Sequence, residues 1–185
     1  MASWGAQRWL ESPHTPATMA VCALHGVVAI LFALRRPAEG AVALGDALRA
    51  LPSMFAGAAA LRLAADAPAW PLGATLLLGL GAAIAALSLA FLGRSFAVLP
   101  ARAGARPLVT RGPYALVRHP AYLGELLVIA GAVAAAWSWR AALVGALAIA
   151  GFVVRMRAEE RRLAEGEDYR AYLRAVRWRW LPGVW

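Results

Sequence analysis

The stretch from Leu108 to Glu125 contains the residue types best suited to chemistry. It reads LVTRGPYALVRHPAYLGE and lies between two apolar segments. It combines basic, aromatic and helix-breaking side chains, which are Arg111, Arg118, His119, Tyr114, Tyr122, Pro113, Pro120, Gly112 and Gly124. A mere connection between membrane helices needs only a few solvated residues. The alternative interpretation is a basic cytoplasmic loop that follows the positive-inside rule.

The proline and glycine positions predict the local structure of this stretch. Gly112-Pro113 predicts a turn. Pro120 suits the first turn of a helix, where its missing N–H costs nothing. Arg118 and His119 would then lie at a helix N-terminus, where free backbone N–H groups and the helix dipole favour an anionic ligand group.

A second polar stretch runs from Arg155 to Tyr172 and follows another apolar segment. Arg155 and Glu159 are four residues apart, so the simplest interpretation is a surface ion pair on one helical face. Glu160 is turned away from that pair and needs a different partner. Glu125 lies inside an apolar segment, where it either pairs with an arginine such as Arg118 or lines a tunnel for a substrate.

Composition indicates an integral membrane protein. The chain has 185 residues, 62% of them hydrophobic, and a mean hydropathy of +0.61; soluble domains have roughly 45–50% apolar residues. The net charge of +9 comes from arginines that cluster at the ends of apolar segments. This distribution fits membrane topology and anionic lipid headgroups better than nucleic acid. Cys22 is the single cysteine, so no internal disulfide can form.

The apolar runs predict about five membrane-spanning helices, at Thr18–Leu34, Leu48–Ala65, Pro71–Leu92, Ala121–Trp137 and Ala141–Val154. A hairpin at Trp137–Arg140 should join the last two, and the final helix should continue as a polar extension to Ala164. Gly166 should interrupt it, and an amphipathic surface helix should follow at Glu167–Arg177.

We therefore expect an all-α protein with one membrane domain over residues 1–185. Its N-terminal helices would occupy residues 1–92 and its cofactor-binding catalytic half residues 93–185. With five spans, most arginines fall on one side, which predicts a cytoplasmic C-terminus. The two polar stretches would then be neighbours on the cytoplasmic face of a multi-pass protein, and a bacterial inner membrane is the expected location.

Several of these residues, in this order, resemble the isoprenylcysteine carboxyl methyltransferase family. They are Gly93-Arg94-Ser95-Phe96, Gly112-Pro113-Tyr114, Val117-Arg118-His119-Pro120, Tyr122, Gly124, Arg155, Glu159-Glu160, Leu163, Gly166, Tyr169, Tyr172 and Leu181-Pro182. The resemblance covers about Leu92 to Pro182. That family belongs to a wider group of membrane methyltransferases that includes the phospholipid N-methyltransferases.

The resemblance implies that S-adenosylmethionine is bound and converted to S-adenosylhomocysteine, with no metal ion. It implies a cofactor site of Tyr114, Arg118, His119, Pro120, Tyr122, Gly124 and Glu159. An arginine suits the cofactor's carboxylate, and tyrosine rings can face its sulfonium cation. It also implies catalytic roles for Arg155, Glu159 and Glu160, and a substrate contact for Arg155. Glu125 is a further candidate for substrate contact, because of its place in an apolar segment.

The reaction that the resemblance favours is carboxyl O-methylation of a lipophilic small molecule or lipid. Arg155 would hold the acceptor carboxylate in line with the methyl group. For an amine or hydroxyl acceptor, Glu160 could instead take the proton. The alternatives are a phospholipid or amine N-methyltransferase, a sterol-reductase-like NADPH enzyme, and a non-catalytic membrane scaffold. We also expect a lateral opening to the bilayer near Glu125, beside Gly124 and Ala121.

Overall fold

The structure, a computed structural model, describes residues 55–64, 67, 69–95 and 107–184. This part of the chain is helical and contains no strand, which confirms the predicted all-α class. Its helices are Phe55–Ala64, α4 (Leu72–Leu92), α5 (Pro120–Ala136), α6 (Trp139–Leu163) and α7 (Glu167–Ala175), with short 3₁₀ turns η1 (Gly93–Ser95) and η2 (Gly112–Ala115).

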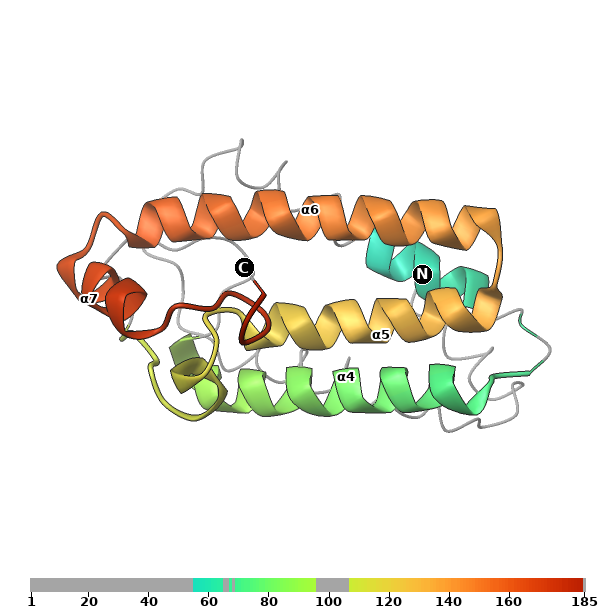
Figure 1. The fold of residues 1–185 in the computed structure, drawn as a ribbon, viewed down its shortest axis with the longest axis horizontal. Helices are drawn as coiled ribbons and strands as arrows, with labels where there is room; N and C mark the ends of the chain where they lie inside the picture. The colour runs from blue at the N-terminus through green and yellow to red at the C-terminus, as the bar shows by residue number, and fades with distance from the viewer. Residues whose placement is uncertain (1–54, 65–66, 68, 96–106, 185) are drawn as a thin grey trace.

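Helices α4, α5 and α6 run side by side along the longest axis of the molecule, and α7 lies at one end of them (Figure 1). After α7, the chain turns back towards the start of α5. Backbone N–H groups of Arg118 and His119 donate to the carbonyls of Trp178 and Arg179, both at 2.9 Å. The C-terminal segment therefore lies directly against the turn that begins α5.

Helices α4 and α5 pack through glycine and alanine. The buried residues of α4 recur every three or four positions, as expected for one helical face, and are Ala74, Leu78, Gly81, Ala85, Ser88 and Leu89. A Cβ on Gly124 would lie 2.5 Å from the backbone N of Ala85, and one on Gly81 would lie 2.6 Å from the carbonyl O of Gly124. The two backbones are thus in direct contact. The expectation of a lateral opening beside Gly124 is wrong at this residue, because α4 occupies the space that a side chain here would need.

The predicted hairpin between α5 and α6 is confirmed. Trp137 takes a left-handed conformation with φ of 34°, which reverses the chain in one residue. The side chain of Ser138 caps α6 by accepting from the backbone N–H of Ala141 at 3.2 Å. Trp137 and Trp139 are both exposed, as aromatic residues at a membrane interface usually are.

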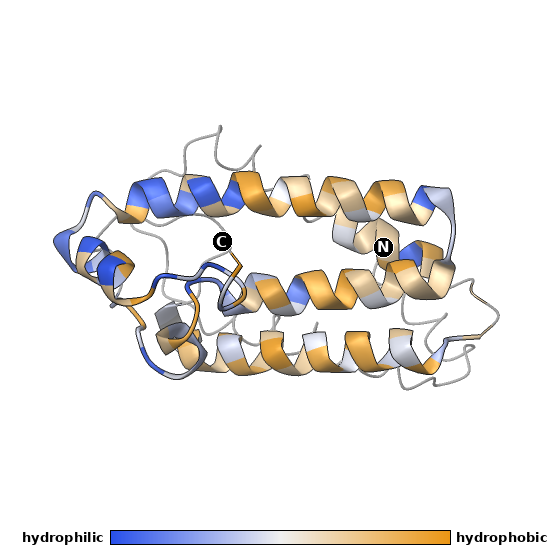
Figure 2. Cartoon of the chain, viewed as in Figure 1, coloured by the Kyte–Doolittle hydropathy of each residue, from blue (hydrophilic) through white to orange (hydrophobic). Residues whose placement is uncertain are grey.

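Two helices, α4 and α6, are long and apolar enough to cross a membrane, while Phe55–Ala64 and α5 are shorter apolar helices. Apolar side chains also cover exposed surface of α4 and α6, including Leu72, Leu76, Leu80, Leu143, Leu147 and Ile149. Figure 2 shows the apolar residues along these helices and the polar residues gathered at the end that carries α7. The molecule therefore suits an apolar environment along its length and a polar one at this end.

The predicted helix positions agree closely with the structure where it describes them. The segment Pro71–Leu92 forms α4, Ala121–Trp137 forms α5, and Ala141–Ala164 lies in or directly after the continuous helix α6. The predicted span Thr18–Leu34 lies outside the described residues, and only part of Leu48–Ala65 lies within them. Five spans and a cytoplasmic C-terminus stay predictions.

Helix α7 begins after Gly166, as predicted, and ends at Ala175, two residues earlier than expected. Its inward side buries Tyr169 and Tyr172, which pack with Val176 and against Leu163. Its arginines lie on the exposed side. Because its apolar residues are covered by the chain itself, this helix needs no lipid to bury them.

Candidate active site

The site is built on the turn that precedes α5. Pro120 is the first residue of the helix and His119 is its N-cap, as the sequence predicted. Before them, Gly112 opens η2 with φ of 62°, a value that suits glycine. A Cβ on Gly112 would also collide with the ring of Phe91 at the end of α4. Glycine at this position therefore lets the turn lie close against α4.

Glu160, near the end of α6, joins three basic or protonatable side chains. Its Oε1 accepts from Nη1 of Arg118 at 3.3 Å and lies 3.2 Å from Nε2 of His119. Its Oε2 accepts from Nε of Arg179 at 2.9 Å. All these side chains are mostly buried, with 6–25% of each exposed. The sequence-based expectation that Glu160 has partners other than Arg155 is thus confirmed.

Arg118 uses its whole guanidinium group within the protein. Besides Glu160, it donates from Nε to the carbonyl of Val176 at 2.7 Å and from Nη2 to the carbonyl of Leu173 at 3.2 Å. These bonds tie the C-terminal segment to the start of α5. The structure therefore assigns Arg118 a role in shaping the site, which the sequence alone did not suggest for it.

Tyr122 gathers a second group of side chains one turn into α5. Its ring stacks on His119, with centroids 5.4 Å apart and an interplanar angle of 13°. The guanidinium carbon of Arg155 lies 5.1 Å from the ring centroid, within the range of a cation–π contact. Its hydroxyl donates to Oε2 of Glu159 at 2.7 Å. Glu159 therefore has a tyrosine partner that the spacing of Arg155 and Glu159 did not predict.

Tyr172 of α7 holds the η2 turn through a hydrogen bond. Its hydroxyl donates to the carbonyl of Tyr114 at 2.7 Å, and both residues are buried. Burial raises the pKa of Tyr172 to about 12, so this hydroxyl keeps the proton that it donates. Burial also raises the pKa of Tyr114. The Tyr114 side chain is thus buried and neutral.

Replacing Tyr172 with Phe should lower the free energy of unfolding by about 1–3 kcal/mol, because the buried carbonyl of Tyr114 loses its donor. Thermal or denaturant unfolding in detergent measures this change. Tyr169→Phe is the matched control, since the Tyr169 hydroxyl makes no hydrogen bond within the described residues. Equal losses in the two variants would show that the Tyr172–Tyr114 bond contributes little.

Two other residues expected in the site, Gly124 and Glu125, lie in different surroundings. Gly124 faces Ala85 and Gly81 of α4, so the geometry argues against a direct cofactor contact there. Glu125 is half-buried in α5. The Arg118 side chain, one candidate partner for Glu125, bonds to Glu160 instead.

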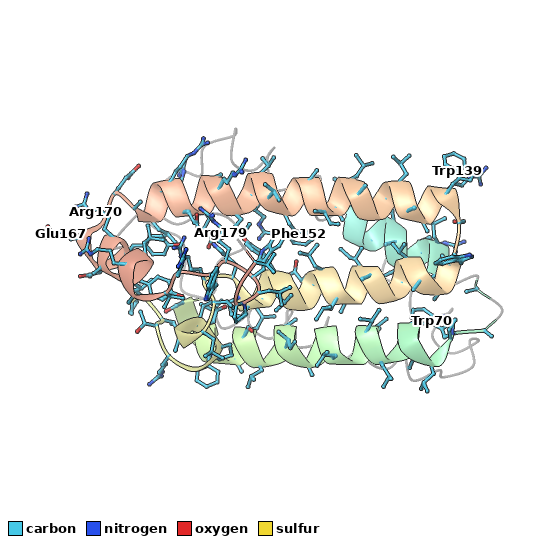
Figure 3. All side chains as sticks on the ribbon, in the orientation of Figure 1. Trp70, Trp139, Phe152, Glu167, Arg170 and Arg179 are labelled. Carbon is cyan, nitrogen blue, oxygen red and sulfur yellow. The ribbon has the colours of Figure 1, made fainter. Side chains whose placement is uncertain are left out.

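The structure therefore brings together most of the expected residues at the polar end of the helices. Arg118, His119 and Tyr122 come from the start of α5, and Arg155, Glu159 and Glu160 come from the last turns of α6. Figure 3 shows Arg179 and Phe152 between α5 and α6, with Glu167 and Arg170 outside them on α7. Within the described part of the chain, no group of His, Cys, Asp or Glu side chains could hold a metal ion.

Sequence reasoning missed Arg179. It stands in the short run Arg177-Trp178-Arg179-Trp180, where two arginines alternate with two tryptophans. The alternation places the two arginines on the same side of an extended chain, and nothing local distinguishes them. Only the fold-back of this segment shows that Arg179 meets Glu160, whereas Arg177 is exposed with its guanidinium over Trp178.

Where the structure describes the chain, these features define an all-helical arrangement of apolar helices with a buried cluster of arginine, histidine, tyrosine and glutamate at one end. The model of the isoprenylcysteine carboxyl methyltransferase (ICMT) family matches residues 74–165, from α4 to just beyond α6. Residues 74–165 therefore match this family, as the resemblance predicted. A search of curated proteins and a search of solved structures each found no match. Membership supports a methyltransferase of the ICMT kind.

Proposed function

We propose that this protein transfers a methyl group from S-adenosylmethionine to the carboxylate of a lipophilic acceptor. The observation that carries the proposal is that the family match includes the whole Arg118–Tyr122 and Arg155–Glu160 cluster. This cluster lies at the polar end of helices whose outer surfaces are apolar. A water-soluble cofactor and a membrane-soluble acceptor can meet at such a boundary.

The residues present fit the cofactor's chemistry. S-adenosylmethionine combines a carboxylate, an ammonium group, a sulfonium cation and a purine, so its site must offer both signs of charge and apolar or aromatic surface. The cluster supplies the guanidinium of Arg155, the carboxylate of Glu159 and the ring of Tyr122, and Glu125 adds a half-buried carboxylate on α5. The first turn of α5 adds backbone N–H groups that have no partner within the helix. When bound, the cofactor would supply an electrophilic methyl group.

The protein's main contribution would be positioning. Arg155 is buried, with 8% of its surface exposed, and lies against Tyr122. From this place its guanidinium can orient an acceptor carboxylate through two parallel hydrogen bonds. Holding two reactants in line removes much of the entropic barrier to transfer. A carboxylate acceptor is already deprotonated, so this reaction requires no general base.

Glu160 is poorly placed to act as a base. Both of its oxygens already accept from cationic groups, Arg118 on one oxygen and Arg179 on the other. A carboxylate that accepts hydrogen bonds from two guanidinium groups stays ionised and has little tendency to take a proton. The candidate proton acceptors for an amine substrate are therefore Glu159 and Glu125, which keeps N-methylation as the alternative reaction.

The acceptor is expected to stay in the bilayer during the reaction. Each CH₂ group moved from lipid to water costs about 0.8 kcal/mol, and exposed leucines line α4 and α6. The cofactor should enter at the polar end, where the arginine-rich half of α6 and α7 lies.

The test is to incubate purified protein with isotopically labelled S-adenosylmethionine and a host lipid extract, and to identify labelled products by mass spectrometry. The proposal predicts a methyl ester that base hydrolysis removes. A base-stable N-methylated lipid or amine would instead support the alternative reaction, N-methylation. Protein that binds the cofactor but labels no acceptor in extracts of several bacterial membranes would contradict both.

Arg155→Gln should lower the rate of methyl transfer by about 100-fold, as expected when a group that orients a reactant is lost. The rate is measured with the acceptor identified above. Arg157→Gln is the matched control, because Arg157 is exposed on the same helix. The assignment of Arg155 fails if both variants retain near-normal rates.

A further inference from the structure

The C-terminal segment Val176–Trp180 lies beyond residues 74–165, the family match, yet it forms one side of the site. It is fixed to the turn before α5 by backbone bonds from Arg118 and His119 and by the side chain of Arg118. Within this segment, Arg179 makes two kinds of contact. Its carbonyl accepts from the N–H of His119, and its guanidinium donates to Glu160.

The contacts of Glu160 determine which nitrogen of His119 carries hydrogen. Glu160 lies between the guanidinium groups of Arg118 and Arg179, which favour its ionised form. An ionised carboxylate can only accept hydrogen bonds. Nε2 of His119, 3.2 Å from Oε1, must therefore be the donor. In the neutral ring, the acceptor lone pair is then on Nδ1.

The two arginines play different parts in this arrangement. Arg118 shares Oε1 with His119, so it competes with the imidazole for the same oxygen. Arg179 contacts the other oxygen, Oε2, from both Nε and Nη2, each at 2.9 Å. This contact opposes rotation of the carboxylate about its Cγ–Cδ bond. Without it, the carboxylate could turn both oxygens towards Arg118 and leave the imidazole without its acceptor.

We propose that Arg179 is a positioning residue that acts through Glu160 to keep His119 in the Nε2–H tautomer, with Nδ1 as the ring's hydrogen-bond acceptor. A fixed tautomer matters because a ligand group that donates a hydrogen bond to Nδ1 would be repelled in the Nδ1–H tautomer. The proposal concerns the site of the proposed function, but it holds for any ligand that this ring contacts.

The experiment measures the ¹⁵N chemical shifts of the His119 ring. The full chain has three histidines, so His14→Gln and His25→Gln variants in a common background leave His119 as the only signal. The protein is labelled with ¹⁵N-histidine, placed in lipid nanodiscs and measured at a series of rising pH values until the two ring shifts no longer change. No cofactor or acceptor is added, so the outcome is independent of methyl transfer.

The expected result is a pair of shifts at the limiting values of the Nε2–H form. Arg179→Gln should move both shifts towards the average of the two tautomers, and Arg179→Lys should restore most of the difference. Arg177→Gln is the matched control, because Arg177 lies in the same segment but is exposed and stacked on Trp178. Its spectrum should equal that of the parent protein. If Arg179→Gln does not fold, Arg179→Met, which keeps the aliphatic length, provides the same comparison.

Three results would overturn the proposal. The first is an Nδ1–H or averaged ring in the parent protein, and the second is an unchanged spectrum after loss of the Arg179 guanidinium. The third is an equal change in Arg177→Gln, which would show that the whole segment, and not the Glu160 contact, sets the tautomer. A protein with no methyltransferase activity could still give the expected spectra, so the two claims can fail separately.

Discussion

Glu160→Gln should lower the free energy of unfolding by about 3–5 kcal/mol, the usual cost of removing one partner from a buried ion pair. The reason is that two mostly buried guanidinium groups, Arg118 and Arg179, would lose their carboxylate. In the fraction that folds, methyl transfer should fall by about 100-fold or more, because the His119 ring would lose the carboxylate that orients it. Denaturant unfolding in detergent and a rate assay under stabilising conditions measure the two effects.

Glu159→Gln is the matched control for this prediction. Glu159 accepts one hydrogen bond from Tyr122, and an amide oxygen can accept the same bond. We therefore expect a loss of no more than about 1 kcal/mol. Similar losses of stability at Glu159 and Glu160 would mean that the Glu160 contacts do not anchor the site.

Gly124→Ala should separate α4 from α5 and destabilise the protein by about 1–3 kcal/mol or more, the range for inserting atoms into a packed core. The added Cβ would meet the backbone of Ala85 at 2.5 Å and that of Gly81 at 2.7 Å. Backbone atoms of a helix cannot move aside as a flexible side chain can, so the helices themselves must shift. Thermal unfolding in detergent should show the loss.

Gly79→Ala tests whether this effect depends on the contact and not on glycine itself. Gly79 lies in α4, is exposed and has no atom within 4 Å of the position of an added Cβ. Alanine favours a helix over glycine by up to about 1 kcal/mol, so this variant should be neutral or slightly more stable. A comparable loss from both substitutions would contradict the close packing of α4 against α5.

The elements that position the site could be predicted from local signals. Pro120 begins α5, Trp137 and Ser138 form the hairpin, and Gly166 separates α6 from α7. Proline and glycine act on the backbone at their own positions, and hydropathy marks the apolar helices between them. These signals need no knowledge of distant residues, which is why the predicted bounds agree with the structure to within a few residues.

The pairing of charged groups could not be predicted in the same way. Glu160 meets Arg118, which precedes it by 42 residues, and Arg179, which follows it by 19. Such contacts depend on how the C-terminal segment folds back, and helical spacing suggested only the nearby Arg155–Glu159 pair. Likewise, the small side chain of Gly124 is compatible with an opening or with close packing, and only the position of α4 decides for packing.

The family match and the structure give different information about the site. The match assigns residues 74–165 to the ICMT family. The structure adds the segment after α7, whose Arg179 and backbone carbonyls complete the surroundings of His119. Protein made for functional work should therefore retain this C-terminal segment, because Arg118 and His119 form hydrogen bonds with it.

The proposed function requires that the polar cluster at the end of α5 and α6 binds S-adenosylmethionine. Calorimetric titration of the purified, folded protein with S-adenosylmethionine and with S-adenosylhomocysteine tests it most directly. We expect both compounds to bind at one site per chain and Arg155→Gln to weaken the binding of both, whereas Arg157→Gln, at an exposed position, should leave binding unchanged. Absence of binding by protein that unfolds cooperatively, or equal affinity in the Arg155→Gln variant, would contradict it.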